Sequence, residues 1–198
     1  MGSTTRARAI GDRRSRRAYT DEALSLAELS FLLWATQGIR QVHPKKIHAF
    51  RTVPSGGCRH PYETYLRVNN AEGLPSGLWR YSAENTSLCQ FGKNQLKGSP
   101  SLADICYGQG FVDKATVTFV WTAIPYRTVW RHGRDSLKDI LISCGHIFQN
   151  LYLACEGIDA GTCAILTYDQ AKLDPYLGVD GVDEISLYVA PVGKVATD

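Results

Sequence analysis

An arginine-rich segment near the start of the chain, Arg13–Arg17, has the residue types that bind a phosphate group. A guanidinium group donates two parallel hydrogen bonds to a pair of phosphate oxygens, and the hydroxyl of Ser15 adds a neutral donor. Alternate side chains of an extended segment point the same way, so we expect Arg13, Ser15 and Arg17 to face one ligand. Taken alone, such a cluster has a solvated basic arm as its alternative interpretation.

A second candidate group is the glycine-containing loop formed by Pro54, Ser55, Gly56 and Gly57. Adjacent glycines let a backbone approach a flat ligand closely, because neither residue carries a Cβ atom. The Gly-Lys-Ser/Thr element of a phosphate-binding P-loop does not follow, which excludes that motif. An ordinary turn before a strand is the alternative for this loop.

A glycine turn, Gly157–Cys163, follows the longest apolar stretch of the chain and can present backbone N–H groups to a cofactor. A simple helix cap is the alternative. His132 is a candidate acid or base, since the charge of histidine changes near neutral pH, although an exposed histidine without a function is the alternative. No Cys-x-x-Cys pair or histidine spacing completes a zinc pattern, so we expect no metal site.

These residues need a scaffold, and the hydrophobic periodicity predicts one. Ser25 and Glu28 have the spacing of a capping box, which predicts a helix that Gly38 ends. The longest predicted helix runs over 136–156 and carries one wide apolar stripe. We further predict a helix that starts at Ser99-Pro100 and strands over 64–68, 78–81, 87–91, 115–123 and 184–190. The mixture indicates an α+β fold, with helices packed on a mixed sheet.

Composition narrows the class of protein further. The chain has 198 residues, 44% of them hydrophobic and 21% charged, which predicts a globular protein with a single domain over 13–198. Residues 1–12 are predicted to be a flexible N-terminal arm, in which Arg6 and Arg8 are bystanders. A net charge of only +3 argues against a nucleic-acid partner. Neither a membrane span nor a secretory signal is evident, so we expect a cytoplasmic protein.

In their order and spacing, these motifs resemble the nitroreductase family. The likeness is greatest to its SagB-type branch, flavin dehydrogenases that oxidise thiazolines and oxazolines in peptide natural products. It extends from about Arg13 to Gly193. The phrases that carry it are Arg13–Arg17, 24–38, 54–63 and the stretch 145–154 that leads into Gly161–Cys163.

The resemblance implies a nitroreductase-like fold, an interlocked homodimer, and FMN bound at the dimer interface in contact with both chains. Arg13, Arg14, Ser15 and Arg17 match the family's contacts to the FMN phosphate and ribityl group. Pro54, Ser55, Gly56 and Gly57 match the loop against the isoalloxazine ring, and Gly161 and Thr162 match the turn at its reactive edge. Gln109 matches a position near the site, and Lys194 is the candidate for a basic residue that helps to hold the phosphate.

The implied activity is ping-pong hydride transfer from NAD(P)H, through flavin N5, to a small electrophile such as a nitroaromatic or a quinone. A SagB-type azoline dehydrogenase acting on a peptide is the alternative. Many such enzymes carry a Lys-Tyr pair where this chain has Arg131 and His132, and arginine cannot act as a base. His132 alone could then relay a proton. A second alternative is a non-enzymatic nucleotide-binding module, against which the modest charge and the glycine loop argue.

Overall fold

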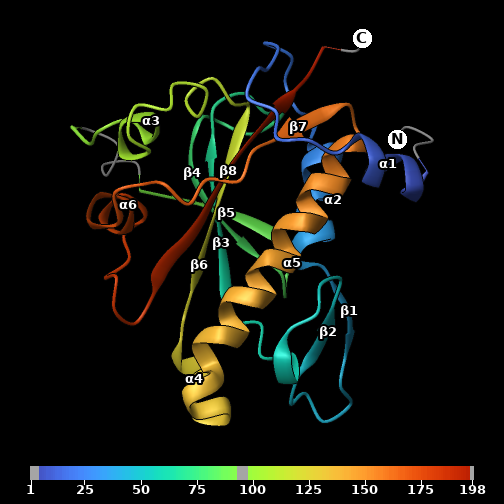
Figure 1. Ribbon diagram of the computed structural model, residues 1–198, viewed down its shortest axis with the longest axis vertical. Coiled ribbons are helices and arrows are strands. Elements are labelled where there is room, and N and C mark those ends of the chain that lie inside the picture. Colours follow the sequence, from blue (N-terminus) through green and yellow to red (C-terminus); the bar gives the residue numbers. More distant parts are fainter. Residues whose placement is uncertain (1–4, 93–97, 197–198) are drawn as a thin grey trace.

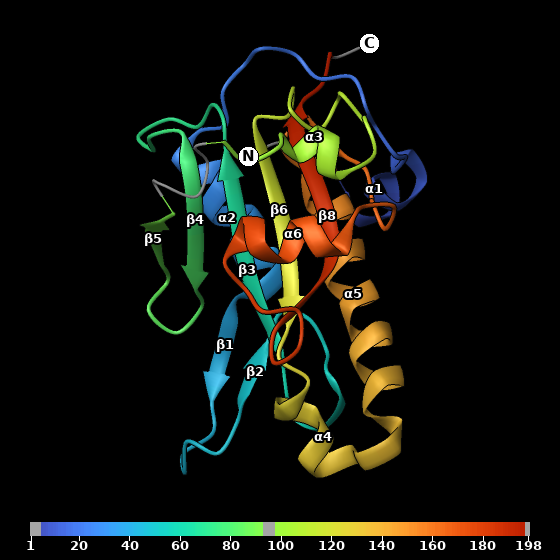
Figure 2. The same cartoon turned by 90° about the vertical axis from the view of Figure 1, so that its left-hand side faces the viewer.

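The computed structural model describes residues 5–92 and 98–196. Within these residues, six strands form one sheet in the order β5-β4-β3-β6-β8-β7, with helices on both of its faces (Figures 1 and 2). Neighbouring strands of this sheet pair antiparallel. Parallel pairing enters at an isolated bridge between Ser15 and Thr162. The predicted α+β class is therefore confirmed. The named strands of the sheet pair antiparallel, and the parallel bridge joins the arginine segment to the sheet edge.

The central strand of this sheet is buried along its whole length, as the run of Val, Thr, Phe and Trp predicts. A small hairpin, β1 and β2, stands apart from the sheet at one end of the molecule (Figure 2). The strands are β1 (Ile39–Val42), β2 (Ala49–Arg51), β3 (Tyr62–Val68), β4 (Gly77–Ser82), β5 (Ser87–Phe91), β6 (Val117–Ala123), β7 (Ala160–Thr162) and β8 (Ile185–Lys194).

Helices α2 and α5 cover one face of the sheet, and α3 and α6 cover the other (Figure 1). The helices are α1 (Arg6–Asp12), α2 (Leu26–Gln37), α3 (Leu102–Ile105), α4 (Tyr126–His132), α5 (Ser136–Glu156) and α6 (Gln170–Leu177). Short 3-10 turns lie at η1 (Gly56–Cys58) and η2 (Gly133–Asp135). No helix within residues 5–92 and 98–196 has both the length and the apolar character needed to cross a bilayer.

The capping box predicted at the start of α2 is confirmed. Ser25 Oγ accepts a hydrogen bond from the Glu28 N–H at 3.3 Å, and Glu28 Oε2 accepts one from the Ser25 N–H at 3.0 Å. Gly38 follows the helix, as predicted, and a Cβ at this position would lie 2.5 Å from the ring of Trp34. Together these contacts fix both ends of the helix.

Helix α5 has the predicted bounds and buries the predicted stripe, with Ile147 and Leu151 fully buried against the sheet. Its other side is unusual, because Leu137, Leu141 and Ile142 are 63%, 52% and 53% exposed. A long apolar helix face in water indicates a surface that another molecule covers.

The structure adds elements that the sequence did not predict. In the segment 1–12, for which we predicted a flexible arm, α1 forms with Thr5 as its N-cap, and it contacts α5. The hairpin β1–β2, the short strand β7 and the helices α4 and α6 were not predicted. Helix α3 starts later than the predicted Ser99-Pro100, because the hydroxyl of Ser101 caps it by accepting from the Asp104 N–H.

Candidate functional site

The arginine segment runs along the free edge of strand β7. The Arg16 N–H donates to the carbonyl of Thr162 at 2.9 Å, next to the bridge between Ser15 and Thr162. A Cβ on Gly161 would lie 2.6 Å from Arg16 Cδ, so glycine is what lets the two backbones approach. Two groups of residues that the resemblance assigns to FMN, Arg13–Arg17 and Gly161-Thr162, are thus adjacent in the structure.

Tyr152 of α5 connects these two groups. Its hydroxyl lies 2.7 Å from Ser15 Oγ and accepts a hydrogen bond from the Ala164 N–H at 3.0 Å. The Arg13 guanidinium stands over its ring, 5.0 Å from the centroid. Sequence reasoning placed Tyr152 only in the apolar stripe of α5; the signal it missed is that a buried tyrosine hydroxyl needs a partner.

The four arginines of the segment have different neighbours. Arg16 is held by an ion pair with Glu156 at 3.4 Å, whereas Arg17 is exposed and stands 5.9 Å from the ring centroid of Phe111. Arg14 is exposed and Arg13 is half-buried. Within the described part of the chain, none of Arg13, Arg14 and Arg17 forms an ion pair, so their charges are available to an anion.

Gln109 lies close to the same end of the molecule. Its amide nitrogen donates to the carbonyl of Cys106 at 3.0 Å and to the carbonyl of Thr167 at 3.3 Å. These contacts hold the chain that follows the Gly161-Thr162 turn. The structure therefore places Gln109 against Thr167, and its contact with FMN stays a prediction.

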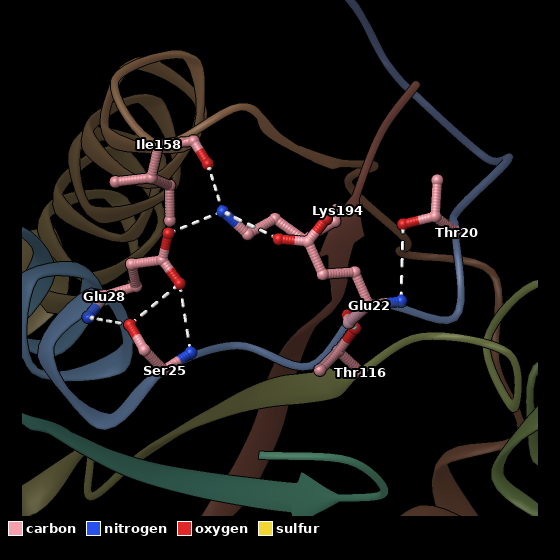
Figure 3. Close-up of polar contacts among 7 residues, drawn as sticks. All are labelled: Thr20, Glu22, Ser25, Glu28, Thr116, Ile158 and Lys194. Carbon is pink, nitrogen blue, oxygen red and sulfur yellow. Dashed lines mark hydrogen bonds and ion pairs between the residues drawn. The ribbon is translucent and has the colours of Figure 1, made fainter. Parts of the chain in front are cut away.

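Lys194 has a different role from the one that the resemblance implies. Its ammonium group donates to Glu28 Oε1 at 2.5 Å and to the carbonyl of Ile158 at 2.7 Å, while the residue is only 8% exposed (Figure 3). Burial opposes ionisation of Glu28, but the hydrogen bonds from Lys194 and Ser25 outweigh it and lower the pKa of Glu28. Lys194 thus closes a buried ion pair between β8 and α2, and we leave it out of the phosphate site.

The glycine loop lies near the other end of α5. Gly56 donates its N–H to Asp139 Oδ1 at 3.1 Å, and a side chain at Gly56 would collide with that carboxylate. Ser55 Oγ accepts from the His60 N–H at 3.1 Å. Gly57, Cys58 and His60 all have positive φ, of 57°, 54° and 43°. Such strain persists where the surroundings hold it, and it concentrates at functional sites. Asp139, which sequence reasoning missed, is the anchor.

His132 lies against this loop. Its Nε2 atom is 3.1 Å from the position that a Cβ on Gly57 would occupy. The same nitrogen is buried and has no hydrogen-bond partner among the residues that the structure describes. Pro54, at the start of the loop, is exposed. His132 and the loop, both placed at the site by the resemblance, are therefore in contact within one chain.

The two groups of candidate residues lie toward opposite ends of α5 (Figure 1). The glycine loop is anchored on Asp139 and the arginine segment on Tyr152, and these anchors are 13 residues apart along the helix, which corresponds to about 20 Å. One chain therefore presents two separate half-sites. The exposed apolar residues of α5, Leu137, Leu141 and Ile142, lie near the Asp139 end of the helix.

Comparisons with known proteins agree on one family. The family model described as "Nitroreductase family" matches residues 10–194. A protein of Methanocaldococcus jannaschii that is named as a nitroreductase is 28% identical over 182 residues, which cover 92% of this chain and 87% of the relative.

Solved structures share the fold. A protein of Ralstonia eutropha, also named as a nitroreductase, superposes with a TM-score of 0.80 at 22% identity, covering 98% of this chain and 85% of that one. A chain of the E. coli microcin synthetase McbBCD complex, solved with truncated pro-MccB17 bound, gives a TM-score of 0.71 at 18% identity and covers 100% of this chain and 76% of that one. At these identities the likeness establishes the fold.

Proposed function

The chain belongs to the nitroreductase family, and from this premise we propose that it is an FMN-dependent oxidoreductase that works as a homodimer. In each of the two sites, the arginine segment of one protomer and the glycine loop of its partner would hold the same FMN. The observation that carries this proposal is the separation along α5 of the two groups of residues assigned to one FMN, which lie about 20 Å apart within a chain.

A two-fold axis that crosses the exposed face of α5 would bring the arginine segment of one chain next to the glycine loop of the other. Such an axis sets two copies of the helix antiparallel, so that the Tyr152 end of one copy meets the Asp139 end of the other. It would also bury Leu137, Leu141 and Ile142, which are all more than half exposed in the single chain. A groove of about 620 Å³ beside the same helix, lined in part by Ile10, Trp34 and Leu153, extends the surface that a second copy can cover.

The arginine segment suits the phosphate of FMN. Arg13, Arg14 and Arg17 carry unpaired charges within the described residues, and guanidinium groups bind phosphate oxygens in pairs. Arg13 is pre-oriented on the ring of Tyr152, which reduces the entropy lost on binding. Ser15 adds a hydroxyl that Tyr152 already orients.

The polar atoms at both half-sites also suit a flavin. Thr162 Oγ1, beside the arginine segment, and His132 Nε2, beneath the glycine loop, are buried without a partner in the described part of the chain. Leaving a buried polar atom unpaired is costly, so these atoms favour a polar ligand at both places. Gly57 is exposed and carries no Cβ, which lets its backbone approach a flat ring.

When bound, FMN supplies the redox chemistry, accepting and donating a hydride at N5. The protein contributes binding, orientation and control of water. The turn at Gly161-Thr162 would position the ring edge through its backbone, and His132 can hold or release a proton beside the loop. We propose NAD(P)H as the electron donor and a small nitroaromatic or quinone as the acceptor. Parallel initial-rate lines, with both substrates varied, test the ping-pong order; intersecting lines would exclude it.

Oxidation of a peptide azoline is the second candidate. His132 favours it, because a proton acceptor lies against the glycine loop. The McbBCD complex, one chain of which shares the fold, was solved with truncated pro-MccB17 bound. Quinone-dependent NADH oxidation without thiazoline-peptide oxidation supports the first candidate, and the reverse result supports the second.

Reconstitution tests the cofactor. Protein incubated with excess FMN and then desalted should keep flavin absorbance, and denaturation should release FMN. The variant Arg13→Ala/Arg17→Ala should lose most of its FMN affinity. Arg8→Ala is the control, since it removes a nearby arginine of α1 that lies outside both the site and the groove beside α5. Equal FMN affinity in the two variants would refute the phosphate assignment.

A further inference from the structure

A second cleft, of about 920 Å³, opens between the hairpin β1–β2 and the adjacent end of strands β3 and β4. Helix α4 closes one side of it through Arg127. The residues that line this cleft include none of those that we assign to FMN. The cleft therefore has a lining of its own, and it borders the glycine loop, because Arg59 Nε donates to the Gly57 carbonyl at 2.9 Å. The proposed flavin chemistry does not identify a ligand for it.

The charge of the cleft is strongly positive. Arginines reach it from four different segments: Arg51 from β2, Arg59 after η1, Arg80 from β4 and Arg127 from α4. Lys46 of the hairpin turn adds a further cation, whereas Glu63 and Glu84 are the acidic residues described in its lining. Like charges gathered in one cleft repel one another, and a bound anion relieves that repulsion.

Glu63 neutralises part of this charge. Its carboxylate pairs with Arg127 at 2.7 Å and with Arg80 at 3.0 Å. Both arginines remain partly exposed, with 40% and 48% of their side chains accessible. Each guanidinium therefore keeps donors that face solvent and that an anion in the cleft can accept.

Three buried polar atoms of lining residues have no hydrogen-bond partner in the described part of the chain: Gln37 Nε2, Arg51 Nε and His60 Nδ1. Arg51 Nη1 donates to Gln37 Oε1 at 2.6 Å, so two of these residues form one unit. Gln37 is 1% exposed and His60 is 6% exposed. Each unsatisfied buried group costs roughly 1–3 kcal/mol, and three of them beside one cleft indicate a polar occupant.

The protonation state of His60 agrees with this interpretation. Burial, together with the charge of Arg51, lowers the pKa of His60 to about 4. A hydrogen bond to the backbone of Ala49 opposes this shift, Arg59 adds to it, and Asp139 opposes it. His60 is thus neutral near pH 7, and its ring can donate or accept one hydrogen bond without adding charge.

We propose that this cleft binds a small organic oxyanion, whose carboxylate or phosphate head lies among Arg51, Arg80 and Arg127. Planar forked donors suit both head groups. The apolar side chains of the hairpin that line the cleft, Ile39, Val42 and Ile47, offer a wall for the carbon body of the ligand. This site is additional to the FMN site and does not depend on it.

Calorimetric titration of the purified, FMN-saturated protein at low ionic strength tests the site, with inorganic pyrophosphate and citrate as probes. Saturable binding of pyrophosphate identifies a phosphate head group, and saturable binding of citrate identifies a carboxylate. Arg51→Gln/Arg127→Gln should weaken the binding about ten-fold or more, since two charge-assisted contacts are lost. Arg67→Gln, on the far end of β3, is the control and should leave the affinity unchanged.

Glu63→Gln supplies a test of opposite sign. It frees Arg80 and Arg127, so it should tighten binding several-fold. This variant also decides the question if Arg51→Gln/Arg127→Gln fails to fold. Absence of saturable binding of both probes in the wild type, or a Glu63→Gln variant that binds no tighter, would overturn the proposal. The same titration without FMN, run on the Arg13→Ala/Arg17→Ala variant so that pyrophosphate cannot bind the vacant arginine segment, separates a failure of this site from a failure of the flavin proposal.

Discussion

The hydroxyl of Tyr152 lies 2.7 Å from Ser15 Oγ and accepts a hydrogen bond from the Ala164 N–H at 3.0 Å. One side chain of α5 therefore orients both the arginine segment and the chain beyond the Gly161-Thr162 turn. The contact with Ser15 spans 137 residues of sequence, so it depends on the completed fold. We infer that Tyr152 positions the phosphate end of the proposed site.

Substituting Tyr152→Phe removes both hydrogen bonds and keeps the ring under Arg13. Each bond is worth about 1 kcal/mol, so the Kd for FMN should rise about five- to ten-fold while the fold is retained. Fluorescence titration of FMN measures the change. Tyr65→Phe is the matched control, because Tyr65 is also buried and donates its hydroxyl proton to Glu184 at 2.9 Å, outside the site. Equal Kd values for the two variants would refute the positioning role.

Much of this architecture was predictable because its signals are local. The capping box at Ser25 and Glu28 and the apolar stripe of α5 each specify a helix within a short window, and both helices have the predicted bounds. The hairpin β1–β2 gave no such signal, since β1 is largely exposed and lacks the apolar alternation of a half-buried strand. Helix α4 starts at Tyr126, and its N-cap residue, Pro125, has no side chain that could form a capping hydrogen bond.

The candidate site also contains residues that the sequence indicates and partner residues that it does not. The order and spacing of the motifs together indicated Arg13–Arg17 and the glycines of the loop. The partners that hold them, Tyr152 and Asp139, are distant in sequence: 83 residues separate Gly56 from Asp139. Lys194 is a case in which residue type and fold differ, because the residue type suits phosphate, whereas the fold pairs Lys194 with Glu28. Pairing over such distances has no counterpart in local sequence patterns.

A charge on the exposed face of α5 should dissociate the proposed dimer. Leu141 is 52% exposed in the single chain, and Leu141→Glu would place a carboxylate in the interface. We expect a folded monomer that retains little FMN, measured by sedimentation and by flavin absorbance. Val182→Glu, at a residue that is 76% exposed in the loop before β8, should remain dimeric and yellow. A dimeric Leu141→Glu variant would place the interface elsewhere.

Lys194→Met should destabilise the fold. It leaves Glu28 partly buried without its cation, so the free energy of unfolding should fall by about 2–4 kcal/mol in urea denaturation. Glu28→Gln/Lys194→Met removes the stranded charge and should recover part of that loss. The double variant should also bind FMN with wild-type affinity. A ten-fold weaker Kd in this folded variant would return Lys194 to the phosphate site.

His60 should make stability depend on pH. Burial lowers its pKa from 6.5 to about 4, so between these values the unfolded chain binds a proton that the folded chain does not. The unfolding free energy should therefore fall as pH decreases from about 6.5 to 4, with a contribution on the order of 3 kcal/mol. Comparing wild type with His60→Gln isolates this contribution, because the variant should lack that part of the slope. Identical slopes would contradict the shift.

The shared flavin site can be tested by mixing two defective variants. Arg13→Ala/Arg17→Ala removes the phosphate half-site. Gly57→Val disrupts the loop half-site, because a β-branched residue is strained at φ 57° and its Cβ meets His132. A hybrid dimer of the two contains one site with both defects and one intact site.

The decisive measurement is FMN retained after desalting, for each variant alone and for an equal mixture refolded together. We predict almost no FMN in either variant alone. In the mixture we predict about a quarter of the wild-type occupancy, since random pairing makes half of the dimers hybrids. A mixture that retains no more FMN than the separate variants would contradict a flavin site shared between two chains.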